Sequence, residues 1–159
     1  MGWFSKKEEA PKKDAAPKKE GVAKLDLVEQ ELNKAGLKHQ RASLGPLEFI
    51  ETGFSGEKTT VKIRFIAVGN DGEFKILSDD FAKFPDEKLV EGYTLANELN
   101  RKYKYVKFAI DNEGDMTAQW DLPDNVPNEA VGATGVEILI RMFQIIDDVY
   151  PEVMKAIWS

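Results

Sequence analysis

The chain ends in NEAVGATGVEILIRMFQIIDDVYPEVMKAIW, residues Asn128–Trp158, and this stretch predicts one long C-terminal helix. Its polar residues recur at spacings of three and four, which puts them in a single stripe along one side of a helix. That stripe consists of Glu137, Arg141, Gln144, Asp148, Glu152 and Lys155. Nearly all the other positions are apolar, so the predicted apolar surface is much wider than that of an ordinary surface helix.

A helix with so much apolar surface needs to be covered on two sides. One cover is the chain's own sheet, and we expect the other to be a second copy of the protein. The predicted interface residues are Leu139, Met142, Phe143, Ile146, Tyr150 and Trp158. The alternative is a helix wholly internal to a monomeric core.

Three residues interrupt the helical pattern. Pro151 lacks a backbone donor and clashes with the preceding turn, so it predicts a kink near Asp147. Gly132 and Gly135 weaken the first turns but allow another backbone to approach closely.

The rest of the chain alternates between helical and strand patterns, and its last two strands form the clearest hairpin. The predicted elements are a helix at Val22–Ala35 ended by Gly36, strands at Leu47–Thr52, Thr60–Val68 and Phe74–Leu77, a helix at Tyr93–Tyr103 capped by Thr94, and strands at Val106–Ile110 and Met116–Leu122. Residues 78–91 follow neither period. The order α-β-β-β-α-β-β-α, with hairpin connections, predicts the α+β class, with an antiparallel sheet whose helices pack on one face.

Residues 1–20 differ in composition from the rest of the chain. They contain Ala-Pro-Lys-Lys twice and carry a local charge of +2, so we expect a disordered tail followed by a single domain at 21–159. The domain then carries −8, which disfavours binding to nucleic acid phosphates. A weaker possibility is contact with a membrane surface through Trp3, Phe4 and the neighbouring lysines.

Composition also limits the compartment and the chemistry. The chain has no Cys, which removes disulfides, thiolate metal sites and cysteine nucleophiles and fits a reducing compartment such as the cytoplasm. No stretch reaches eighteen uninterrupted apolar residues, so no integral membrane segment is expected.

No residue pattern predicts a catalytic, metal or cofactor site. His39 lies in a polar linker without a second His and is expected to be exposed, and neither Ser43 nor Ser55 matches a nucleophile elbow. The acid pairs Asp79-Asp80 and Asp147-Asp148 are interpreted as solvated carboxylates. The segment Asp111–Asp115 lacks the closing Glu of a calcium loop and is interpreted as a turn.

The element order, the segment Asn97-Glu98-Leu99-Asn100, the strand Lys107-Phe108-Ala109-Ile110 with its hairpin, and the long terminal helix resemble the YbjN-like family of bacterial proteins. This resemblance covers residues 22–158 and implies the fold of type III secretion chaperones. It also implies a small, acidic, cytoplasmic, dimeric protein associated with regulation or with holding other proteins. No catalytic residue is carried over.

These observations lead to a non-enzymatic homodimer that binds an unidentified protein through the exposed face or edge of its sheet. Two alternatives stay open. One is a secretion-chaperone-like protein that holds an extended partner chain. The other is a small-ligand sensor with a pocket between the first helix and the sheet, lined by Phe49, Phe65 and Phe108.

Overall fold

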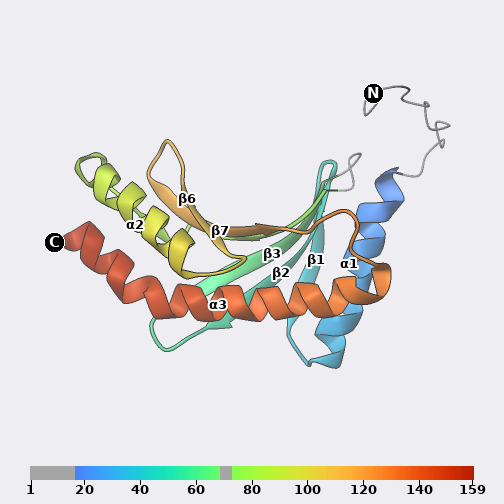
Figure 1. The fold of residues 1–159 in the computed structure, drawn as a ribbon. Helices are drawn as coiled ribbons and strands as arrows, with labels where there is room; N and C mark the ends of the chain where they lie inside the picture. The colour runs from blue at the N-terminus through green and yellow to red at the C-terminus, as the bar shows by residue number, and fades with distance from the viewer. Residues whose placement is uncertain (1–16, 69–72) are drawn as a thin grey trace, which may run out of the picture.

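The structure, a computed structural model, describes residues 17–68 and 73–159, without the side chains of residues 17–20 and 68. In this part of the chain three α-helices lie against a seven-stranded sheet (Figure 1). The elements are α1 Pro17–Lys34, β1 His39–Leu44, β2 Leu47–Ser55, β3 Thr60–Val68, β4 Glu73–Ser78, β5 Ala82–Lys83, a 3-10 helix Asp86–Lys88, α2 Leu89–Lys102, β6 Lys107–Ile110, β7 Asp115–Asp121 and α3 Asn128–Trp158. The predicted α+β class with an antiparallel sheet is confirmed.

Every strand pair in the sheet is antiparallel. The strands β1, β2, β3 and β4 follow one another across the sheet, and β4 and then β5 pair with successive parts of β7. Gln119 of β7 pairs with Leu77 of β4 and also with Lys107 of β6, so β6 must lie on the other side of β7. Apart from the two-residue β5, which pairs with β7 alone, the two edges of the described sheet are therefore β1 and β6.

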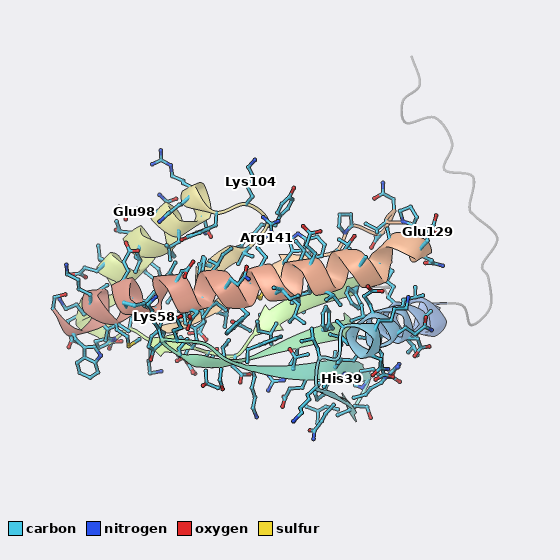
Figure 2. All side chains as sticks on the ribbon, turned by 90° about the horizontal axis from the view of Figure 1, so that it is seen from below. His39, Lys58, Glu98, Lys104, Glu129 and Arg141 are labelled. Carbon is cyan, nitrogen blue, oxygen red and sulfur yellow. The ribbon has the colours of Figure 1, made fainter. Side chains whose placement is uncertain are left out.

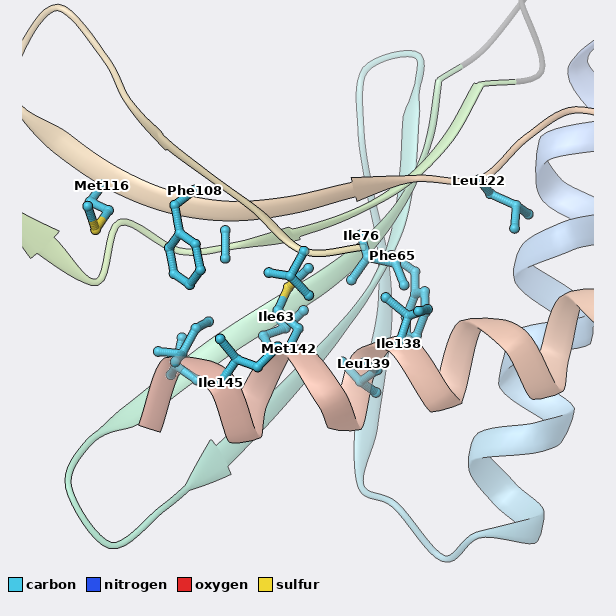
Figure 3. Packing of buried hydrophobic residues seen from close by; sticks show 14 of the residues in the cluster. Ile63, Phe65, Ile76, Phe108, Met116, Leu122, Ile138, Leu139, Met142 and Ile145 are labelled. Atoms are coloured by element: carbon cyan, nitrogen blue, oxygen red, sulfur yellow. The ribbon is translucent and has the colours of Figure 1, made fainter. Parts of the chain in front are cut away.

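Alternating side chains explain which face of the sheet is covered. In β3, Val61, Ile63 and Phe65 are buried while Lys62 is exposed between them, as expected for a strand with one face in a core. Figure 3 shows Ile63 and Phe65 pointing toward α3. The helix contributes Ile138, Leu139, Met142 and Ile145 to this core, and the far end of the sheet adds Phe108 and Met116.

The long helix α3 has the predicted bounds, and most of its apolar surface is covered by the sheet and by both other helices. It contacts β3 and β7, α1 near its start and α2 toward its end. The helix continues through Pro151, and Figure 1 shows it changing direction in its last third, the part that contains this proline. The two coverings that such an apolar helix requires are thus present within one chain.

The glycines of α3 mark where α1 crosses it. A Cβ at Gly132 would lie 2.8 Å from the carbonyl oxygen of Leu27, and a Cβ at Gly135 would lie 3.2 Å from a methyl group of Val28. The predicted close approach of another backbone is confirmed at Gly132.

The starts of two helices differ from those predicted. α1 begins at Pro17, which takes in four residues assigned to the tail, while residues 1–16 lie outside the described part of the chain. Gly36 ends this helix as predicted, with a φ of 68°, but Ala35 is exposed instead of buried. α2 begins at Leu89, so Thr94 lies inside the helix, where its hydroxyl donates to the carbonyl oxygen of Val90; the predicted cap is wrong.

Two strands were not predicted. β1 occupies the polar segment interpreted as a linker, and β5 is a two-residue strand within the segment that followed neither period. The connection between β3 and β4, residues 69–72, lies outside the described residues, but the two strands pair as the arms of a hairpin, as the predicted hairpin connections require.

Candidate protein-binding surface

One face of the sheet, here called the open face, points away from the helices. Cross-strand partners lie on the same side of a sheet, so the pairings place Glu51, Arg64 and Leu77 in one row and Phe49 and Ile66 in the next. Phe49, Ile66 and Leu77 are each only partly buried. The open face thus carries apolar side chains without a helix above them.

Paired charges border these apolar side chains. The Arg64 guanidinium donates to Glu51 across 2.8 Å and also to Asp79, and the Lys62 ammonium lies 3.4 Å from Glu51. Burial raises the pKa of Glu51, but the hydrogen bond and the charge of Arg64 outweigh this and hold it below its ordinary value. Asp79, interpreted from the sequence as a solvated carboxylate, keeps 36% of its side chain exposed and is also ion-paired with Arg64, which the sequence did not indicate.

The edge strand β6 is closed by a side chain of α2. The Asn100 amide nitrogen donates to the carbonyl oxygen of Phe108 across 3.0 Å, and the Phe108 N–H donates to the Asn100 amide oxygen across 2.6 Å. These two hydrogen bonds take the place of those that a neighbouring strand would make, and they occupy the N–H and C=O groups of Phe108, which would otherwise face outward. Asn100 belongs to the segment that suggested the family resemblance, but no sequence pattern indicated this role.

The opposite edge strand, β1, is tied to α1 through its side chains. His39 lies with Nδ1 2.9 Å from the carbonyl oxygen of Leu37 and Nε2 3.3 Å from Glu29, and its side chain is 12% exposed. The Arg41 guanidinium binds Asp26 and lies 3.4 Å from Glu48. The expectation that His39 is exposed is therefore wrong. Figure 2 shows His39 and Glu98 of α2 on opposite sides of α3.

The predicted interface residues of α3 divide into two groups. Leu139, Met142 and Ile146 have no exposed surface, because they form the core with the chain's own sheet. Phe143 and Tyr150 are partly buried, and the Phe143 ring stacks on Phe54 with centroids 4.8 Å apart. Trp158 is 81% exposed. A partner can therefore reach only the last three of these positions, and the helix-mediated dimer stays a prediction.

Asp147 holds the loop between β2 and β3 against α3. Its carboxylate accepts backbone N–H groups of Glu57, Lys58 and Thr59 at 2.9 to 3.2 Å. The hydrogen bond from Lys58 and those from the other two amides lower the pKa of Asp147. Asp147 lies at the surface, as its interpretation as a solvated acid implies, but it also fixes this loop, and Gly56 leaves space for its carboxylate.

The remaining candidate residues also have structural roles or lie on the surface. Ser55 accepts a hydrogen bond from Thr60, and Ser43 is exposed. Asp111 accepts the N–H groups of Glu113 and Asp115, which confirms the predicted turn. Within residues 17–68 and 73–159, no three His, Asp or Glu side chains gather as a metal site would require.

The pocket expected between the first helix and the sheet does not have the predicted lining. Phe65 and Phe108 are buried core residues, whereas Phe49 lies on the open face. A different cavity, of about 290 Å³, lies between the start of α1 and the turn after β1, and its lining includes Val22 and Pro46.

In the described part of the chain, every helix is too short or too polar to cross a membrane. Comparison with curated proteins gives no match for this chain. The model of the YbjN family, described as "Putative bacterial sensory transduction regulator", matches residues 24–153, from α1 to near the end of α3. The match includes both edge strands, the open face and Asn100. The chain therefore belongs to the YbjN family.

Proposed function

We propose that this protein is a non-enzymatic, homodimeric regulatory module of the bacterial cytoplasm that acts by binding another protein. The observation that carries the proposal is the open face, where Phe49, Ile66 and Leu77 remain partly exposed beside the Glu51–Arg64 ion pair. Apolar side chains with a polar border are the usual composition of a protein interface. The family description, a regulator of sensory transduction, agrees with such a role.

The roles of the titratable side chains support a function without catalysis. His39, Asp79 and Asp147 each hold two elements of the fold together. A general acid or base needs a position beside a substrate site, and these groups are instead used to join a helix, a strand or a loop to its neighbour.

The partner that best fits the open face is a protein surface with an apolar centre and few unpaired charges. The charges of Glu51 and Asp79 are balanced by those of Arg64 and Lys62, so this group of ion pairs favours a neutral partner over a strongly charged one. A secretion-chaperone-like role, in which an extended chain lies across this face, is the second candidate because the same apolar side chains would serve it.

The test is site-specific photo-crosslinking in bacterial cells, with the photoreactive residue at Ile66 on the open face or at Thr94 on the outer side of α2. We expect a discrete adduct from Ile66 that disappears when Leu77→Lys is added and persists when Ala133→Lys is added on the exposed side of α3. Equal adducts from Ile66 and Thr94, or an adduct that is insensitive to Leu77→Lys, would reject the open face as the binding surface.

The homodimer is tested separately by light scattering over a concentration series. A mass near twice 17.9 kDa that persists on dilution supports it, and a mass near 17.9 kDa at every concentration rejects it.

A further inference from the structure

We propose that β1 of one copy pairs antiparallel with β1 of a second copy, so that the two sheets join into one. This inference rests on the homodimer of the proposed function and assigns its contact to a strand edge instead of to α3. A second copy is the favoured partner because, in one antiparallel register, the side chains of β1 are compatible with those of another β1.

The β1 edge lacks most of the features that usually prevent strands from pairing. Soluble proteins protect sheet edges with Pro, Lys, inward-pointing charges, bulges or a covering element, and in β1 the only inward-pointing charged or basic side chains, His39 and Arg41, are paired with acidic residues of α1. The sequence His39–Leu44 contains neither Pro nor Lys, and its pairing with β2 runs without a bulge from His39 opposite Thr52 to Leu44 opposite Leu47. The other edge, β6, is closed by Asn100.

The two basic side chains of β1 leave this edge accessible. His39 and Arg41 lie on the helix side of the sheet, because their partners Thr52 and Ile50 are buried there. Both are held by acidic residues of α1, so neither extends outward along the sheet plane. Because these ion pairs hold both side chains toward α1, the outward-facing backbone groups of β1 are left free to pair.

Hairpin geometry shows which backbone groups those are. Gly45 has a φ of 59° and is followed by Pro46, as suits a two-residue turn closed by Leu44 and Leu47. The closing pair of such a hairpin is hydrogen-bonded, and bonded pairs alternate along the ladder. The N–H and C=O groups of Arg41 and Ser43 consequently point away from β2.

One register fits a two-fold axis. With the axis at Ala42, Arg41 lies opposite Ser43 of the other copy, and the outward backbone groups of this pair can bond to each other. On the open side, Gln40 lies opposite Leu44, which is 72% exposed in the single chain. An axis at Arg41 would instead set two guanidinium groups opposite each other, which is unfavourable.

Cysteine cross-linking tests both the surface and the register, because the natural chain contains no Cys. Ala42 would face its own copy as a non-hydrogen-bonded pair with Cα atoms about 4.5 Å apart, within the range of about 4.4 to 6.8 Å that a disulfide spans. Two Gln40 residues would be displaced by four positions, about 13 Å along the strands, and would not link. Ala133→Cys, on the exposed side of α3, reports random collisions.

We expect Ala42→Cys to form a disulfide-linked dimer under mild oxidation at least tenfold more than Gln40→Cys or Ala133→Cys. A mixture of Gln40→Cys with Leu44→Cys should link as a heterodimer. If the wild type has the mass of a dimer but Ala42→Cys links no more than Ala133→Cys, the edge pairing is rejected while the homodimer stands. If Gln40→Cys alone links as well as Ala42→Cys, the register is rejected. A wild-type monomer at every concentration rejects both proposals.

Discussion

Replacing Gly132 with Ala tests the crossing of α1 over α3. The added Cβ would lie 2.8 Å from the Leu27 carbonyl oxygen and 3.3 Å from the Glu31 Cβ. The first atom belongs to the backbone of α1, so relief requires that one helix move away from the other. Val28 and Leu32 of α1 are fully buried, and such a movement would loosen their packing.

Two opposing effects set the magnitude. Ala is better than Gly inside a helix by about 0.8 to 1 kcal/mol. Overpacking of a well-filled core costs about 1 to 3 kcal/mol, and the rigid carbonyl places this contact toward the upper end. We expect a net loss of about 1 to 2 kcal/mol in the free energy of unfolding, or a decrease in Tm of about 2 to 8 °C for a domain of this size.

Chemical denaturation and thermal unfolding measure this loss, with two variants of the same helix as controls. Ala133→Gly, on the exposed side, measures the helix preference alone and should cost about 1 kcal/mol. Gly135→Ala meets only side chains, at 3.2 and 3.3 Å, and should cost less than Gly132→Ala. A Gly132→Ala protein that is more stable than the wild type by about the Ala133→Gly difference would show that α1 does not cross α3 here.

Three further predictions concern the loop, the closed edge and the end of the chain. Asp147→Ala should speed amide hydrogen exchange at Lys58 and Thr59. Because the folded-state pKa of Asp147 is lowered, the stabilisation that this carboxylate provides is present above the ordinary carboxyl pKa and is lost as the pH falls through the lowered value. The wild type and the variant should therefore have equal stability only in acid. Asn100→Ala should lower the free energy of unfolding by about 1 to 3 kcal/mol, since it leaves backbone groups of the buried Phe108 without partners, and an unchanged denaturation midpoint would contradict the closure of β6. Trp158→Ser should change stability by less than about 0.5 kcal/mol, since the ring is largely exposed; a dimer-to-monomer change in light-scattering mass with this variant would return the dimer contact to α3.

The elements predicted best from the sequence are those whose burial follows a simple period. The bounds of α3 and β3 agree with the predictions because apolar and polar residues alternate there with helical or strand spacing. β1 was missed because its helix side carries His39 and Arg41, which are compensated by acidic residues of another element. No local period can show a compensation between segments that are distant in sequence.

The candidate surface was predicted only in part, for a related reason. Alternation in β3 indicated that one face of the sheet is exposed, but the width of the apolar surface of α3 could not show what covers it. α1 crosses at Gly132 and supplies much of the cover that was assigned to a second copy. The roles of Asn100 and Asp147 depend on backbone groups of other segments, so they required the three-dimensional arrangement.

The closure of β6 by Asn100 also limits how far copies of this protein can assemble. A sheet with two free borders can add molecules indefinitely and grow into a fibre. A sheet with one blocked border can be extended only at the other, so association through strands ends once two molecules have met. In the proposed β1 pairing, the amide of Asn100 would therefore help to limit association to two molecules, and its loss would expose the backbone groups of Phe108 to pairing with another chain.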